Sequence, residues 1–210
     1  MKHLKKFNEA IINHQSTDID NFINSLQSDR PMIPFDRVLE VGEANNIEVV
    51  DYDTFYAELP ERDKPTAPPR HIPFFALVNP TTKRPRLVLH RRPLPKQMLN
   101  FIEDVLHHEM IHVGQHATRT IDKSLPNPND RKSYFSDTDE IMAFSYSLAK
   151  EIFNAFNIKT AKEGMDKLIE DYSLRFPKFR LYKDVKDNVD IKILQKYHKY
   201  IYLYLEDLLK

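Results

Sequence analysis

The residues with the clearest capacity for chemistry lie in one short run, His108-Glu109-Met110-Ile111-His112. Residues four apart on an α-helix share one face and are separated by about 6 Å along its axis, so the imidazoles of His108 and His112 can converge on one metal ion. Glu109 is rotated by about 100° from His108, where its carboxylate can deprotonate a metal-bound water without being a ligand. This spacing predicts a metal site with a general base beside it.

The alternative is a coincidental or structural pair of histidines, because buried histidines are commonly no more than hydrogen-bonding groups. The frequencies of His and Glu in this chain give only about 0.02 chance matches to the motif. The motif also falls within a strongly apolar run that follows Pro95 and has the three- and four-residue periodicity of a half-buried helix. This context favours the metal site.

A catalytic zinc ion needs a third protein ligand and one open position. His116 lies about 12 Å from His108 along an unbroken helix, which is too far for a ligand of the same ion. Glu140 stands near the start of a later predicted helix, with the small residue Ala143 one turn on, so a close helix contact can bring its carboxylate to the ion. Glu140 is therefore a candidate for the third ligand.

This arrangement resembles the gluzincin group of zinc peptidases, especially small bacterial and phage-encoded members in which the ligand glutamate opens a Glu-x-x-Ala helix. The resemblance covers roughly residues 85 to 155. It implies that His108, His112 and Glu140 bind zinc and that Glu109 is the general base. It departs from the thermolysin-like pattern at Phe144, where those enzymes have an aspartate that orients the first histidine.

The departure leaves the supporting groups of the site open. Asp137 and Asp139 are candidates for orienting a histidine ligand. Tyr134 and Tyr146 are candidates for stabilising the oxyanion, although tyrosines in helices more often belong to the core. The nearby histidines outside the motif are expected to have no catalytic role: His90, His107 and His116.

Composition excludes several other classes of protein. The 210 residues contain 31 basic and 31 acidic side chains, no cysteine and only three glycines. Thiol nucleophiles, cysteine-bound zinc and glycine-rich phosphate loops are therefore excluded or disfavoured. A basic cluster between 83 and 96 can be read as a phosphate-binding patch, but a solvated face is the simpler interpretation, so we expect no nucleic-acid partner. With neither a secretory signal nor a membrane span visible, we expect a cytoplasmic protein with no membrane contact.

The expected fold is α+β, mainly α, with a zincin-like core in which a small β-sheet or hairpin packs beside the His-Glu-x-x-His helix. N- and C-terminal helices flank this core. We divide the chain into an N-terminal helical segment (1–45), a metallopeptidase core (46–158) and C-terminal helices (159–210), packed together as one domain. The strand that ends at His90 either offers an edge to the substrate backbone or simply covers the core.

Periodicity and turn residues predict the individual elements. Phe35 to Val41 adds a helical turn that Gly42 is expected to end, and a polar loop is expected over 119–137. The other predicted elements are helices over 3–13, 17–28, 138–157, 159–174 and 187–209, a strand over 47–56, and a hairpin of 74–78 with 87–90.

The leading functional hypothesis is a zinc metallopeptidase that acts on a protein or peptide substrate. Two alternatives stay open: a nonenzymatic structural or interaction protein, for example a viral one, that retains the metal site, and a hydrolase that cleaves another kind of bond.

Overall fold

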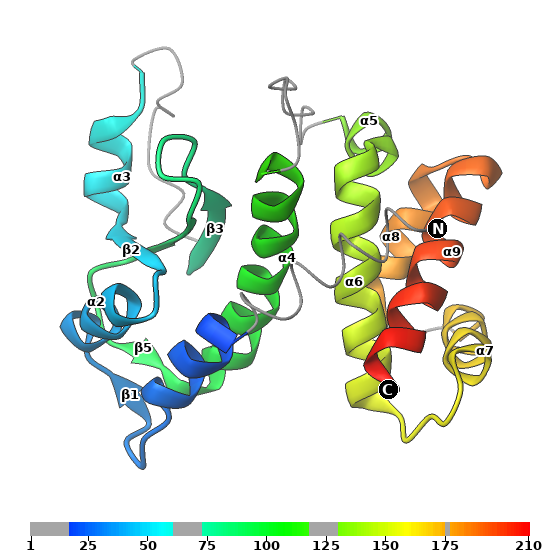
Figure 1. Cartoon of the computed structure of the whole chain (residues 1–210), viewed down its shortest axis with the longest axis horizontal. Coiled ribbons are helices and arrows are strands. Elements are labelled where there is room, and N and C mark those ends of the chain that lie inside the picture. Colours follow the sequence, from blue (N-terminus) through cyan, green and yellow to red (C-terminus); the bar gives the residue numbers. More distant parts are fainter. Residues whose placement is uncertain (1–16, 61–72, 118–129, 175–176) are drawn as a thin grey trace. The chain divides into compact units, whose positions relative to one another are not determined.

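A computed structural model describes residues 17–60, 73–117, 130–174 and 177–210, and Figure 1 shows the order of its elements. The predicted helix over 3–13 lies outside these residues. Contacts within the chain group it into two units, Met1–Arg119 and Thr120–Lys210. The predicted core segment, 46–158, contributes to both units.

The first unit contains a three-stranded sheet in the order β2-β4-β3. Strand β4 is parallel to β2 and antiparallel to β3, which confirms the predicted hairpin. A second, two-stranded sheet pairs β1 with β5. The strands are β1 (Met32–Ile33), β2 (Glu48–Asp51), β3 (Phe74–Val78), β4 (Pro85–Leu89) and β5 (Leu94–Pro95).

The position of β4 decides between the two interpretations of the strand that leads to His90. Because β4 is paired on both sides, its backbone has no open edge for a substrate, and the edge interpretation is wrong for this strand. Among the described residues, β3 has β4 as its only partner. The edge strands of this small sheet are therefore β2 and β3, and β3 is the one that packs against α4.

The helices of the first unit differ from the expectation in two places. The predicted strand over 47–56 ends at Asp51, because its carboxylate accepts the backbone N–H of Thr54 at 2.8 Å and caps a helix there. Gly42 lies inside a helix and does not end it. The helical segments are 17–26, α2 (Phe35–Ala44), α3 (Tyr52–Glu58), η2 (Lys96–Met98) and α4 (Leu99–Ala117).

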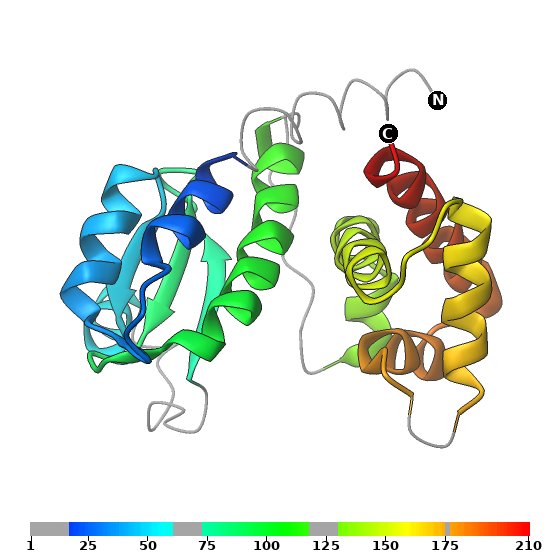
Figure 2. The same cartoon turned by 90° about the horizontal axis from the view of Figure 1, so that it is seen from below.

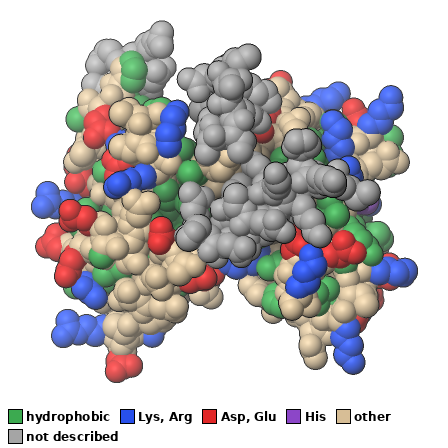
Figure 3. Space-filling model, viewed as in Figure 1, with side chains coloured by type: hydrophobic (Ala, Val, Ile, Leu, Met, Phe, Trp, Pro, Cys, Tyr) green, Lys and Arg blue, Asp and Glu red, His purple; other side chains and the backbone are tan. Residues whose placement is uncertain are grey.

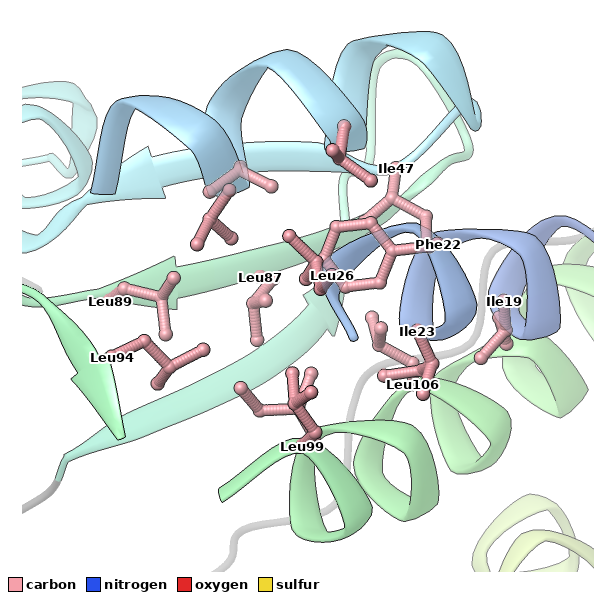
Figure 4. Close-up of a cluster of buried hydrophobic side chains, with 14 of the residues drawn as sticks. Ile19, Phe22, Ile23, Leu26, Ile47, Leu87, Leu89, Leu94, Leu99 and Leu106 are labelled. Carbon is pink, nitrogen blue, oxygen red and sulfur yellow. The ribbon is translucent and has the colours of Figure 1, made fainter. Parts of the chain in front are cut away.

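The core of the first unit lies on one face of the sheet (Figure 4), where helix 17–26 lies between α2 and α4 (Figure 2). Residues that alternate along β4, Leu87 and Leu89, point into this core. The buried stripe of α4 recurs at helical spacing and packs there too: Leu99, Ile102, Leu106, Met110 and Val113. Burial of this stripe fixes the rotation of α4 about its axis, and therefore the direction of its remaining side chains.

The second unit is made of helices around its own core. The predicted loop over 119–137 is wrong for its last part, because Asp130 caps the short helix α5 by accepting from Ser133 N at 3.1 Å. Helix α8 was not predicted; the buried Asp171 carboxylate accepts the backbone N–H groups of Lys178 and Phe179, each at 2.9 Å, just before it. The helices are α5 (Arg131–Ser136), α6 (Thr138–Ala155), α7 (Ala161–Tyr172), α8 (Arg180–Asn188) and α9 (Ile191–Leu208).

The fold class is therefore mainly helical with a small sheet, as the sequence predicts. None of the helices that the structure describes is long and apolar enough to cross a lipid bilayer.

Candidate metal centre

Helix α4 carries the His-Glu-x-x-His motif at its middle, next to the stripe that anchors it. Met110 and Ile111 are buried, whereas His108, Glu109 and His112 are each partly exposed. The apolar residues therefore hold the helix, and the three polar ones remain accessible to a ligand. The sequence predicts this arrangement, in which one face of a half-buried helix packs in the core and the other remains exposed.

The two histidines of the motif face each other across one helical turn. Their Nε2 atoms are 3.2 Å apart, and the rings meet edge to face with centroids 4.9 Å apart. Two nitrogens bound to one tetrahedral ion at 2.0–2.1 Å are separated by about 3.3 Å. The pair thus already has the spacing of two ligands of one zinc ion.

A buried glutamine orients His112. The Oε1 atom of Gln115 lies 2.8 Å from Nδ1 of His112, and the Gln115 side chain is only 3% exposed. Since an amide oxygen can only accept, this contact places the imidazole proton on Nδ1 and leaves the Nε2 lone pair for a metal. Gln115 was not predicted from the sequence; its spacing of one helical turn from His112 was the available signal.

We expect the replacement of Gln115 by Met, which has a similar size but no amide, to weaken zinc binding about 10- to 100-fold, as losses of ligand-orienting groups generally do. Competition titration against a chromophoric chelator measures this affinity. The matched variant is Gln115→Glu, which retains an oxygen acceptor and should keep most of the affinity. Equal affinities for Gln115→Met and the wild type would show that the glutamine does not orient the ligand.

Glu109 follows His108 on the same helix and is partly exposed. Consecutive residues of an α-helix are rotated by about 100° about its axis, so Glu109 does not share the face on which His108 and His112 meet. In this position, the Glu109 carboxylate is better suited to accept a proton from a nearby water than to bind the same ion as a third ligand.

Glu140 belongs to the second unit, in the first turn of α6. It is buried, at 5% exposure, and Ala143 one turn later is fully buried. Burial raises the pKa of Tyr197 on α9, and the nearby Glu140 carboxylate raises it further. The role of Glu140 as a zinc ligand stays a prediction.

The other candidates around α6 have structural contacts. Asp137 caps the helix by accepting from the backbone N–H of Asp139 at 2.9 Å. Phe144, at the position of the missing aspartate, packs against Tyr134 with ring centroids 5.7 Å apart. Tyr146 packs edge to face with the ring of Tyr204. Asp137 is therefore a capping residue, and Tyr134 and Tyr146 pack against the core of the second unit. The orienting roles of Asp137 and Asp139 and the catalytic roles of the two tyrosines stay untested predictions.

Two of the remaining histidines have structural surroundings of their own. His90 stacks on Tyr52, with centroids 4.3 Å apart and planes 17° from parallel. Burial, and then the nearby Tyr56, raise the pKa of Tyr52 to about 12, so its ring stays neutral. His107 is buried against two carboxylates, which are considered below. His116 lies on α4, but its side chain is outside the described residues.

Two members of the basic cluster between 83 and 96 have local contacts. Arg86 forms ion pairs with Glu48 and Glu58. Lys96 donates to the backbone oxygen of Ser28 at 2.6 Å. In the view of Figure 3, Lys and Arg side chains are interspersed with Asp and Glu. These contacts fit a solvated charged surface; the lack of a nucleic-acid partner stays a prediction.

None of three comparisons, with models of protein families, with curated proteins and with solved structures, found a match to this chain.

Proposed function

We propose that this protein is a zinc-dependent metallopeptidase of the gluzincin kind, with a zincin-like core. His108, His112 and Glu140 would hold the zinc ion, and Glu109 would be the general base. The observation that carries the proposal is the separation of 3.2 Å between the two imidazole Nε2 atoms, on a helix that also presents a glutamate between them in sequence. The Gln115 contact supports it, because it turns the Nε2 atom of His112, and not its Nδ1 atom, toward the position of a shared ion.

A zinc ion bound here supplies Lewis acidity, polarising the scissile carbonyl and lowering the pKa of water to about 7. Glu109 takes a proton from the attacking water as the new C–O bond forms. It then passes that proton to the amide nitrogen as the C–N bond breaks, so one carboxylate serves as base and then as acid. Its partial exposure keeps it accessible to both water and substrate.

The substrate backbone would lie along β3. This strand contacts α4 within the first unit and is one of the two edge strands of the described three-stranded sheet. A peptide that paired with β3 would extend the sheet beside the motif by β-augmentation. The five positions of β3 are all partly exposed, which leaves room for side chains of the peptide.

The test is zinc binding measured together with casein hydrolysis. His112→Ala and Glu140→Gln should each weaken zinc binding at this site by more than the roughly 10- to 100-fold loss for a group that only orients a ligand, and should abolish hydrolysis. His90→Gln is the matched control, because that histidine packs on Tyr52 in the same unit. It should bind zinc and cleave casein as the wild type does.

Each other outcome has a distinct meaning. Unchanged zinc affinity in Glu140→Gln would remove Glu140 from the ligand set. Zinc bound by the wild type without cleavage of casein, test peptides or the chain itself would favour the nonenzymatic alternative. No zinc binding at the histidines would overturn the proposal.

A further inference from the structure

A second cluster of potential metal ligands lies entirely within the first unit. His107 on α4 has its Nε2 atom 3.7 Å from Oδ1 of Asp20 and 3.8 Å from Oε1 of Glu103. One ligand atom from each residue lies within 4.8 Å of the other two. Asp20 comes from helix 17–26, and Glu103 lies one turn before His107 on α4. Neither carboxylate belongs to the His-Glu-x-x-His motif.

The distances in this cluster suit a shared cation better than direct hydrogen bonds. A charged hydrogen bond from imidazolium to carboxylate is about 2.7–2.9 Å long, much shorter than either separation here. Ligands at about 2.1 Å from one ion are about 3.4 Å apart at a tetrahedral angle and up to about 4.2 Å apart across the ion. The separations of 3.7 and 3.8 Å lie within this range.

The types of the three side chains, like the distances between them, fit a site for a divalent cation. One imidazole and two carboxylates bring a charge of about −2, which a divalent cation neutralises. The His107 side chain is 6% exposed, whereas Glu103 is 25% and Asp20 55% exposed. The nitrogen ligand is therefore buried at the base of the cluster, and the carboxylates leave solvent access for entry of the ion.

Packing holds both supporting helices in place without the metal. Ile19, on helix 17–26 next to Asp20, and Leu106, on α4 next to His107, are both fully buried in the same core (Figure 4). The ligands are thus attached to elements that the core already fixes, which reduces the cost of assembling the site.

We propose that Asp20, Glu103 and His107 bind a divalent transition-metal cation such as Zn²⁺, which links helix 17–26 to α4. This site is separate from the proposed catalytic centre and does not depend on it. Its effect is structural: a cation that bridges the two helices stabilises the first unit, because it binds the folded state and not the unfolded chain.

The experiment uses the full chain carrying His108→Ala and His112→Ala, so that the proposed catalytic site contributes no binding. Calorimetric titration of this metal-free protein with Zn²⁺ should show one bound ion per chain, and Zn²⁺ should raise its unfolding temperature. Adding Asp20→Asn and Glu103→Gln should lower the affinity at least 10-fold and remove the rise in unfolding temperature. Both replacements conserve shape at exposed or half-exposed positions, and circular dichroism confirms folding.

The matched control carries Asp18→Asn and Asp104→Asn in the same background, which removes the same charge from the same two helices. It should bind Zn²⁺ as the background does. No binding by the background, or equal loss in the control and the test variant, would overturn the proposal. Failure of the catalytic proposal gives a different result, since the wild type would then bind no more zinc than the His108→Ala, His112→Ala background.

Discussion

Replacing Glu109 by Gln should lower the rate of peptide hydrolysis about 10²- to 10⁴-fold, the usual contribution of general acid–base catalysis. The amide has the size of the carboxylate but cannot take a proton from water or return one to the leaving nitrogen. Because Glu109 is a neighbour of the paired imidazoles and not a proposed ligand, zinc binding should be nearly unchanged. The measurements are kcat with a casein or fluorogenic peptide substrate and the zinc content of each variant.

The matched control for this variant is Asp104→Asn, which removes a carboxylate from an exposed position on the same helix. It should retain full activity. If Glu109→Gln retained it too, Glu109 would not be the base. If both zinc-loaded wild type and variant were inert towards every peptide, the nonenzymatic alternative would explain the metal site better.

The parts of the structure that the sequence predicts best are those in which local pattern and tertiary packing agree. The apolar stripe of α4 repeats over five positions, so a single buried face explains it, and the helix follows. The antiparallel hairpin of β3 and β4 is joined by a short connection rich in turn residues. Since these signals are local, they could be read without knowledge of the rest of the chain.

Other elements depend on single capping contacts or on pairing between distant residues. The β-branched and aromatic residues after Ile47 favour a strand, but the Asp51 cap starts helix α3 among them. Just before helix α8, the Asp171 carboxylate accepts the backbone N–H groups of Lys178 and Phe179, a contact between residues that are not neighbours in sequence. The parallel pairing of β2 with β4 joins segments far apart in sequence, for which periodicity contains no information.

In the candidate site, too, the sequence predicts local contacts and does not predict contacts that depend on tertiary packing. The spacing of His108 and His112 is a helical property, so the sequence predicts their meeting. The Gln115 contact needs the side-chain rotamers, and the cluster of His107 with Asp20 needs the packing of two separate helices. Glu140 lies on a separate helix, and its proposed role as a ligand comes from the resemblance to the gluzincins, because local spacing does not link it to the two histidines.

The replacement Gly42→Ala should destabilise the first unit by about 1–3 kcal/mol, the usual cost of overpacking. In an exposed helix interior the same replacement usually stabilises the protein, because alanine is more favourable there than glycine by about 1 kcal/mol. The expected change at Gly42 therefore has the opposite sign. A Cβ atom on Gly42 would lie 2.5 Å from Cγ2 of Val49 and 2.9 Å from the backbone oxygen of Ile47. A backbone atom cannot rotate away as a side-chain terminus does.

The strain would extend beyond α2, because the chain turns back directly after it. The backbone N–H of Ile47 donates to the oxygen of Gly42 at 2.9 Å, and Val49 lies on β2, which pairs with the central strand β4. Moving β2 to admit a methyl group would therefore weaken the sheet that supports α4. Gly164→Ala is the control: its Cβ would meet the termini of the Leu205 and Ile158 side chains at 2.8 and 3.0 Å, which can change rotamer. Urea denaturation should show a clearly larger loss of stability for Gly42→Ala than for Gly164→Ala, and a Gly42→Ala protein as stable as the wild type would contradict this close approach of α2 and β2.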